Sequence, residues 1–223
     1  MTTQYIDPAR MCVWVHTWWK RDGVRDATLR SLDASDAAGR YEVCRQGEDQ
    51  CKVHFFISTI QEMCSSGKYD WILRLEDDTI VNKHLIHNVC TWPVPHVEPK
   101  FGMGFLSVTD PVLKDSAHVG VGEKLKTPWR KYEKGVHFGG GILWEALTLA
   151  PRINRIKGCM CRTPGHLSCA VCPSTIFFQD GLRSYWHVPS LVRIDLKIPR
   201  HDGKVVGENI YGSQPFDAKF RRA

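Results

Sequence analysis

The sequence predicts one α/β domain with a mostly parallel sheet flanked by helices. Short apolar segments, typical of buried strands, alternate with segments whose apolar residues recur every three to four positions, as on one face of a helix. The order strand, helix, strand, helix, strand, helix implies right-handed crossovers between parallel strands. A chain of 223 residues, of which 43% are hydrophobic and 24% charged, has the size and composition of an ordinary globular domain.

The net charge of +6 suits an anionic partner. Apart from Arg221 and Arg222 the basic residues are scattered, so no nucleic-acid groove is predicted, whereas a diphosphate needs only a few cations. No segment has the roughly twenty apolar residues that cross a bilayer, and Met1 to Arg10 lack the apolar core of a signal peptide. Nine scattered cysteines indicate reduced thiols, and we expect a soluble, cytoplasmic protein.

Strands and helices alternate regularly in the first half of the chain. Strands are expected at 11–15, 41–44 and 69–75, and a proline-rich break at 92–95 ends the last helix of this half. The three helices are predicted from the apolar faces Val24, Thr28, Leu29 and Leu32; Val53, Phe56, Ile60 and Cys64; and Leu85, Ile86, Val89 and Cys90.

A polar, cationic turn follows the first strand. A strand that leads through such a turn into a helix is a common place to bind a nucleotide. Thr17, Lys20 and Arg21 are therefore candidate contacts for a base or a diphosphate. The alternative is that Lys20 and Arg21 are solvated and that Trp18 and Trp19 belong to the core.

Three consecutive carboxylates, Glu76, Asp77 and Asp78, follow the strand at 69–75. In an extended backbone Glu76 and Asp78 point to the same side, and ligands of open α/β sheets bind at the carboxyl ends of strands. Crowded carboxylates favour a cation between them, and Mg²⁺ or Mn²⁺ is usually held by one or two carboxylates and phosphate oxygens. We predict a divalent-metal site here. The alternative is that Asp77 or Asp78 caps a helix starting near Asn82.

The second half of the chain is less regular. A long polar stretch at 109–134 is expected to form a surface loop. The predicted elements around it are a strand at 101–108, a helix from Leu143 to Ala150 that stops at Pro151, a strand at 176–178, a short helix through Tyr185 and Trp186, and an amphipathic strand at 190–198.

Three glycines at 139–141 lie between a predicted strand and the helix that follows. Glycine lets a ligand or another segment approach the backbone closely, so Gly139 and Gly140 are candidate ligand contacts. The run lacks the Lys-Ser/Thr ending of a P-loop.

A small Cys-rich loop region surrounds His166. Four closely spaced thiols can enclose a tetrahedral Zn²⁺, which would be structural because four protein ligands leave no open position. The first pair is separated by one residue where two are commoner, so buried free thiols and disulfides are alternatives. The four are Cys159, Cys161, Cys169 and Cys172.

Two further residues are candidates with simpler alternatives. Asp180 follows an apolar segment and precedes a predicted helix, which suits a helix cap or a catalytic carboxylate. His201, in the loop-like tail, is either a metal ligand or a solvated histidine.

Four motifs, which follow one another in the order expected for the class, resemble the GT-A class of nucleotide-sugar glycosyltransferases over about residues 11–201. They are similar to the nucleotide-binding strand, turn and helix of that class, to its D-x-D-type acid motif, to its glycine-rich segment beside the donor sugar, and to its later acidic motif with a Pro-Ser-Leu-Val strand. The chain also resembles the catalytic domains of large glycosyltransferases encoded by chlorella viruses, which would place it in the host cytoplasm. The motifs are 11–32, 71–78, 138–143 and 178–192.

The resemblance implies a GT-A-like, Rossmann-like catalytic domain over residues 1–223. Its nucleotide-binding part would be about 11–108, its acceptor and catalytic part about 109–201, and its tail 202–223.

The resemblance also implies roles for the candidate residues. Asp78 would ligate Mn²⁺ or Mg²⁺, and Glu76 and Asp77 would support the metal or contact the ribose. The class often supplies a further ligand from a histidine after the Pro-Ser-Leu-Val strand, which is displaced here to His201. Asp180 would lie near the acceptor hydroxyl.

These inferences predict a metal-dependent glycosyltransferase that moves a sugar from a UDP-sugar to a hydroxyl of a glycan or glycoconjugate. Asp180 would deprotonate the acceptor if the reaction inverts the anomeric centre, and would support an oxocarbenium-like centre if it retains. One rival is a metal-dependent hydrolase of nucleotides or phosphate esters that uses the same carboxylates. The other is a non-catalytic binding module stapled by zinc.

Overall fold

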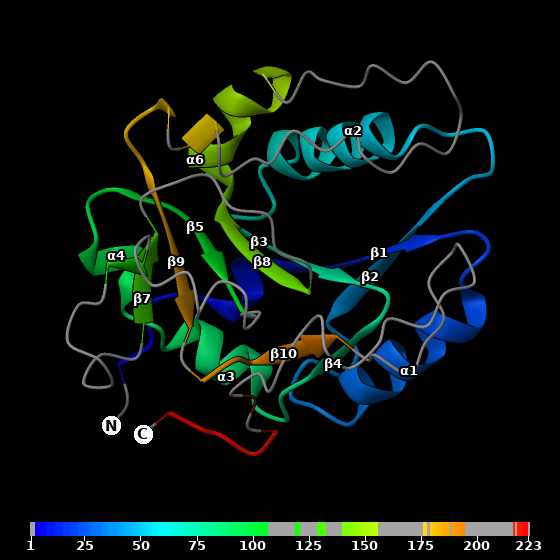
Figure 1. Cartoon of the computed structure of the whole chain (residues 1–223), viewed down its shortest axis with the longest axis horizontal. Coiled ribbons are helices and arrows are strands. Elements are labelled where there is room, and N and C mark those ends of the chain that lie inside the picture. Colours follow the sequence, from blue (N-terminus) through cyan, green and yellow to red (C-terminus); the bar gives the residue numbers. More distant parts are fainter. Residues whose placement is uncertain are drawn as a thin grey trace.

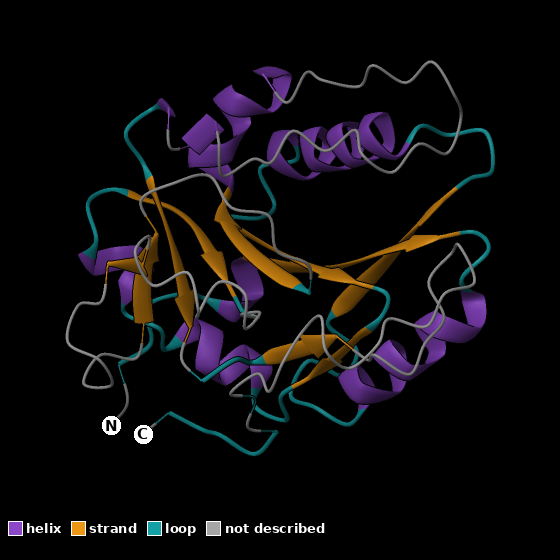
Figure 2. Ribbon diagram, viewed as in Figure 1, coloured by secondary structure: helices purple, strands orange, loops and turns teal. Residues whose placement is uncertain are grey.

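An eight-stranded mixed sheet runs through the centre of the molecule, with helices on both faces (Figures 1 and 2). The computed structural model describes residues 3–106, 119–120, 129–132, 140–155, 176–177, 179–187, 189–194, 216 and 218–222. The strand order is β2-β1-β3-β8-β5-β9-β7-β6. The strands are β1 (Met11–Trp18), β2 (Tyr41–Gln46), β3 (Trp71–Glu76), β5 (Phe101–Phe105), β6 (Val119–Gly120), β7 (Trp129–Tyr132), β8 (Gly141–Glu145) and β9 (Arg183–His187).

The long strands of this sheet mostly run in one direction. β1 pairs in parallel with β2 on one side and with β3 on the other, and β5 pairs in parallel with β9. β8 lies antiparallel between β3 and β5, so β2, β1, β3, β5 and β9 share a direction, while β7 runs antiparallel to β9 and β6 to β7. The predicted α/β class, with a mostly parallel sheet flanked by helices, is confirmed. The Cys-rich loop region lies outside the described residues.

Helices cover the sheet from two sides and create two apolar cores. Leu32 of α1 and Leu85 and Val89 of α3 pack on one face, whereas Ile60 of α2 and Leu149 of α6 pack on the other. The helices are η1 (Pro8–Arg10), α1 (Asp22–Asp33), α2 (Lys52–Ser65), α3 (Leu85–Cys90), α4 (Val94–Val97), α6 (Ala146–Leu149) and η3 (Ala150–Arg155). Among the helices of the described residues, none has both the length and the apolarity needed to cross a membrane.

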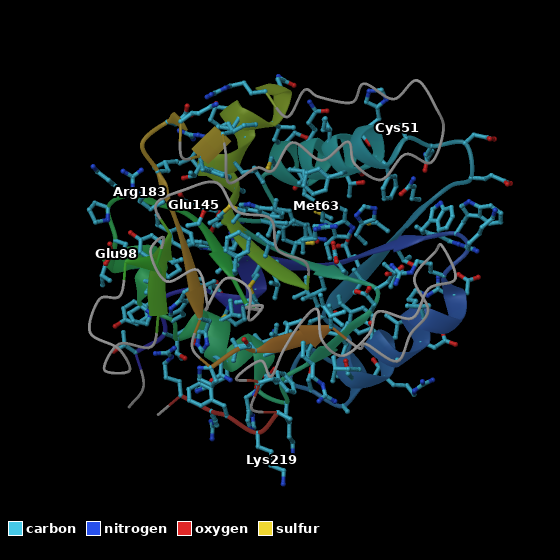
Figure 3. All side chains as sticks on the ribbon, viewed as in Figure 1. Cys51, Met63, Glu98, Glu145, Arg183 and Lys219 are labelled. Carbon is cyan, nitrogen blue, oxygen red and sulfur yellow. The ribbon has the colours of Figure 1, made fainter. Side chains whose placement is uncertain are left out.

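The continuous apolar sequence of β1 follows from this two-sided covering. Val13 and Val15 belong to the core under α1 and α3, whereas Cys12 and Trp14 belong to the core under α2. Parallel strands with helices on both faces read as unbroken apolar segments for this reason. Met63 joins the second core from α2 (Figure 3).

Four predicted elements of the second half differ from the structure, and the first is the loop expected at 109–134, which contains strands β6 and β7. The helix expected from Leu143 begins only at Ala146, because residues 141–145 form strand β8 between β3 and β5. Ile176 and Phe177 are helical instead of extended. Tyr185 and Trp186 lie in strand β9 instead of a helix, because β9 bridges β5 and β7.

A second, two-stranded sheet packs against α1. In it β4 (Thr79–Val81) pairs antiparallel with β10 (Val192–Ile194). Within the predicted strand at 190–198, the described residues end at 194, and 192–194 are extended. The helix expected near Asn82 begins later, at Leu85.

Candidate functional site

The three acids lie where β1 and β3 end side by side. In the parallel register His16 of β1 is opposite Glu76 of β3, so the turns that follow the two strands are neighbours. The chain passes from β1 outward to β2 and returns to β3 on the other side, so the strand order reverses between β1 and β3. In open α/β sheets, ligands bind in the crevice at such a reversal, outside the carboxyl ends of the strands.

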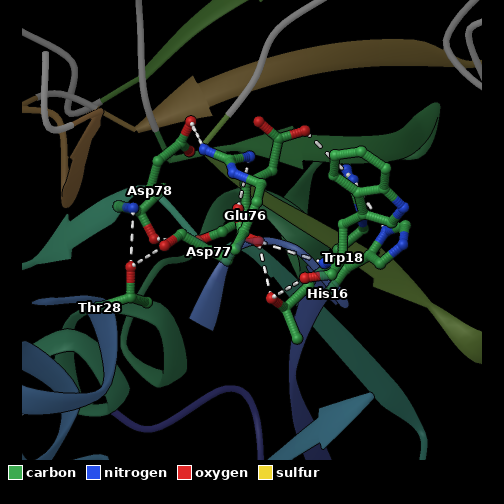
Figure 4. Close-up of polar contacts among 10 residues, drawn as sticks. His16, Trp18, Thr28, Glu76, Asp77 and Asp78 are labelled. Carbon is green, nitrogen blue, oxygen red and sulfur yellow. Dashed lines mark hydrogen bonds and ion pairs between the residues drawn. The ribbon is translucent and has the colours of Figure 1, made fainter. Parts of the chain in front are cut away.

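Asp77 is fully engaged by the neighbouring β1–α1 turn (Figure 4). The residue is only 2% exposed, and its Oδ2 accepts hydrogen bonds from Thr17 Oγ1 at 2.7 Å and from the Trp18 backbone N–H at 3.4 Å. Arg21 Nη1 lies 2.7 Å from Asp77 Oδ1, and Thr28 Oγ1 donates to the Asp77 carbonyl. Burial raises the pKa of Asp77, and Arg21 opposes that shift. Asp77 thus ties β1, α1 and β3 together.

Asp78 is only partly satisfied. Arg21 Nη2 lies 3.0 Å from its Oδ2, whereas its buried Oδ1 has no hydrogen-bond partner within the described residues. Burial, and then the charge of Glu76, raise the pKa of Asp78 to about 6 against the influence of Arg21. A buried carboxylate oxygen without a partner is costly, and it is the type of ligand that Mg²⁺ and Mn²⁺ prefer.

Glu76 is the most exposed of the three acids, with 28% of its side chain accessible. Arg74, two residues earlier on the same face of β3, donates to Glu76 Oε1 at 3.2 Å and lies 3.3 Å from His16 Nδ1. Sequence reasoning missed Arg74 and His16. The available signal was a charged residue inside an apolar strand, placed on the same face as Glu76.

Most of the predicted residues of the first half gather here, together with Gly140 of the second half. Thr17 and Arg21 meet the acids, and the Gly140 carbonyl accepts a hydrogen bond from the Glu76 backbone N–H at 2.9 Å. Gly140 has φ +96°, which side-chain-bearing residues rarely adopt. Lys20 instead places its ammonium group 4.6 Å from the centre of the Trp19 ring.

The alternative role of the acids as helix caps does not agree with the structure. The carboxylate of Asp36 accepts hydrogen bonds from the backbone N–H groups of Ile86 and His87, at the start of α3. Asp77 instead binds the β1–α1 turn.

Asp180 lies at the amino ends of the parallel strands, whereas the acids lie at their carboxyl ends. Asp180 precedes β9, and Arg183, the first residue of β9, pairs with Phe101 at the start of β5. The other end of β5 pairs with Ile142 of β8, which in turn pairs with β3 near the acids. The residues of β5 span about 13 Å. Asp180 pairs with Arg155 at 2.5 Å and with Arg152 at 2.8 Å, and these arginines lower its pKa. The structure therefore does not bring Asp180 to Glu76 and Asp78.

The remaining predicted residues lie outside the described part of the chain. They are Gly139, His201 and the four cysteines Cys159, Cys161, Cys169 and Cys172. Within the described residues, no group of three or more histidine, cysteine, aspartate or glutamate side chains is arranged to hold a metal ion. The candidate site there consists of two carboxylates, Glu76 and Asp78, beside two arginines.

Comparison with known proteins gives no family: no protein-family profile matches the chain, and no curated protein sequence matches it. Among solved structures, A197 from STIV is similar to this chain with a TM-score of 0.47 and 13% identity, covering 82% of this chain and 83% of that one. Mannose-1-phosphate geranyltransferase from Thermus thermophilus is similar with a TM-score of 0.46 and 12% identity, covering 80% of this chain and 73% of that one.

Proposed function

We propose that this chain is a metal-dependent glycosyltransferase that moves a sugar from a UDP-sugar to a hydroxyl of a glycan or glycoconjugate. The proposal depends on one observation: Glu76 and Asp78 lie at the point where the strand order reverses, and a buried oxygen of Asp78 has no partner within the described residues. Such a point is where open α/β sheets bind nucleotides. No comparison supports the resemblance to chlorella-virus enzymes, which stays a prediction.

Asp78 and Glu76 fit a hard divalent cation. Carboxylate oxygens suit Mn²⁺ and Mg²⁺, and one or two carboxylates suffice when substrate phosphates complete the coordination. Asp78 offers its unpartnered Oδ1, and Glu76 a partly exposed carboxylate. When bound, the metal supplies positive charge beside the diphosphate that leaves as the glycosidic bond breaks. A structural Zn²⁺ at the four clustered cysteines is a separate proposal.

The β1–α1 turn would hold the diphosphate. Helix α1 starts at Asp22 without a side-chain cap, so the backbone N–H groups of its first turn can face an anion. Thr17 and Asp77 fix this turn against β3, which keeps its position constant when the nucleotide arrives. We leave Asp180 out of the chemistry because it lies at the other end of the parallel strands.

The experiment is a thermal-shift screen of nucleotide diphosphates and their sugars with and without Mn²⁺, followed by transfer assays on the donor that is found. A ligand that binds only the native state raises its apparent stability. Asp78→Asn should abolish the Mn²⁺-dependent shift and lower transfer by about 100-fold or more, because the cation loses a charged ligand. Transfer at the wild-type rate by Asp78→Asn in the presence of EDTA would refute the site.

Asp180→Asn is the matched control. It removes a carboxylate that is bound by two arginines away from the site, so transfer should stay near the wild-type rate. Loss of transfer in a folded Asp180→Asn protein would restore the prediction that this residue acts on the acceptor. Assays without acceptor separate transfer from the rival hydrolase, which should release nucleotide at an undiminished rate.

A further inference from the structure

Arg21 joins the two aspartates of the candidate site. Its Nη1 lies 2.7 Å from Asp77 Oδ1 and its Nη2 lies 3.0 Å from Asp78 Oδ2. Its Nε is buried and, like Asp78 Oδ1, has no hydrogen-bond partner within the described residues. One guanidinium group therefore holds both carboxylates while a donor and an acceptor in the same site remain unused.

We propose that Arg21 is a built-in counter-ion that makes divalent-cation binding depend on a diphosphate. This inference rests on the proposed function, because it concerns the same cation and the same donor. Among the described residues, the ion pairs of this site join the three carboxylates of Glu76, Asp77 and Asp78 to the guanidinium groups of Arg21 and Arg74. A divalent cation that approaches Asp78 meets the like charge of Arg21 and competes with it for that carboxylate.

A diphosphate relieves this competition. Arginine binds phosphate oxygens through its planar fork in the same two-bonded way as it binds carboxylates. Arg21 directly precedes α1, so the phosphate that it meets would also face the N-terminal end of that helix. A guanidinium that turned to the phosphate could use its unpartnered Nε and would release Asp78 Oδ2 to the cation.

The neighbouring contacts allow Arg21 to move without disturbing the site. When Arg21 leaves, Asp77 Oδ2 keeps its hydrogen bonds from Thr17 Oγ1 and the Trp18 backbone N–H. The Asp77 carbonyl stays bound to Thr28 Oγ1, which also accepts a hydrogen bond from the Thr79 backbone N–H. The backbone on both sides of Asp78 is thus held independently of Arg21.

A counter-ion role and a purely structural role of Arg21 can be told apart because the coupling between two binding free energies is reciprocal. If the diphosphate strengthens cation binding by some factor, the cation strengthens diphosphate binding by the same factor. An Arg21 that acts as a counter-ion opposes the cation when the diphosphate is absent and supports the diphosphate when it is present. An Arg21 that only maintains the fold would lower both affinities when it is replaced.

The test measures binding of Mn²⁺ alone, of UDP alone, and of Mn²⁺ in saturating UDP to the full chain by isothermal titration calorimetry. UDP should tighten Mn²⁺ binding to the wild type by about tenfold or more. Arg21→Gln keeps amide donors for Asp77 but removes the charge. It should bind Mn²⁺ alone about tenfold more tightly than the wild type, bind UDP more weakly, and lose most of the coupling. Arg25→Gln, which removes a salt bridge to Asp22 on the same helix, should behave like the wild type.

Each outcome decides the inference. If Arg21→Gln binds Mn²⁺ no more tightly than the wild type, or keeps the full coupling, Arg21 is not the counter-ion. If the wild type binds neither Mn²⁺ nor UDP, the proposed function itself fails. Should Arg21→Gln not fold, Arg21→Met decides: methionine keeps an unbranched side chain but removes the charge that opposes the cation, so Mn²⁺ alone should bind more tightly than to the wild type. Unchanged Mn²⁺ affinity of Arg21→Met would then overturn the inference.

Discussion

At the scale of single residues, Asp77 and Asp78 show how adjacent carboxylates take different roles. The sequence predicts three acids after a strand but does not distinguish them, because their roles depend on partners about 60 positions away. Asp77 meets Thr17 at a separation of 60 residues and is saturated by hydrogen bonds, whereas Asp78 keeps one unpartnered oxygen. Asp77 therefore holds the turn, and Asp78 is the better cation ligand.

We expect Asp77→Asn to lower the free energy of unfolding by about 2 kcal/mol, because both oxygens of Asp77 accept hydrogen bonds and an amide must turn its NH₂ group toward either Arg21 or Thr17. Asp22→Asn is the control, since Asp22 pairs with Arg25 and Arg45 but is 51% exposed. Exposed pairs contribute little, so that variant should lose less than about 1 kcal/mol. Urea unfolding of both variants measures the difference, and equal losses would show that Asp77 is not the structural acid.

At the scale of strands and helices, the first half of the sheet could be predicted and the second half only in part. β1, β2 and β3 alternate with helices of clear 3.6-residue periodicity, so their order implied parallel pairing. β8 and β9 are short central strands whose partners lie far away in the sequence. A five-residue apolar segment next to a helix cannot be separated from that helix by periodicity, because neither shows an alternating pattern.

Gly104 on β5 shows how closely α3 and its following turn approach the sheet. A Cβ atom at position 104 would lie 2.5 Å from Cζ3 of Trp92, which is fully buried and cannot move aside easily. We expect Gly104→Ala to destabilise the fold by about 1–3 kcal/mol through overpacking. Thermal unfolding measures this change.

Gly23→Ala is the control for Gly104→Ala. Gly23 lies in helix α1, and apart from its chain neighbours and the backbone of its own helix no atom lies within 4 Å of an added Cβ, so alanine should stabilise the helix by about 0.5–1 kcal/mol. Shifts of the same sign in the two variants would contradict the packing argument.

At the scale of the whole molecule, the site could be predicted as separate pieces but not as an assembly. The sequence indicated a cationic turn after the first strand and acids after the third, and the parallel register of β1 and β3 brings them together. It did not indicate that Arg21 would bind the acids, nor that Asp180 would lie at the other end of the parallel strands, because both depend on the strand order across the full sheet.

The C-terminal segment 218–222 also joins distant parts of the molecule. The Ala218 carbonyl accepts a hydrogen bond from the Lys83 backbone N–H, and Asn88 of α3 binds Phe220 and Arg222. Lys219 points outward between these contacts (Figure 3). The segment therefore fixes α3 and the chain at Lys83, which follows β4.

His187 of β9 contacts the C-terminal segment, and these contacts fix the protonation state of its ring. Its Nδ1 lies 2.7 Å from the Pro189 carbonyl and its Nε2 lies 2.6 Å from Arg222 Nη2. A carbonyl only accepts and a guanidinium only donates, so the ring must be neutral with its proton on Nδ1. Burial, together with the charge of Arg222, lowers the pKa of His187 to about 3 from an ordinary value of 6.5.

The folded protein should therefore lose stability as the pH falls below 6.5, because the unfolded chain takes up a proton at His187 that the folded chain rejects until about pH 3. From pH 7 to 5 this residue should remove about 2 kcal/mol from the free energy of unfolding. His187→Gln cannot titrate, so urea unfolding across this range should give it a shallower pH dependence than the wild type. His54→Gln, on the exposed side of α2, should keep the wild-type slope. Parallel slopes for the wild type and His187→Gln would show that His187 is not held neutral between β9 and the C-terminal segment.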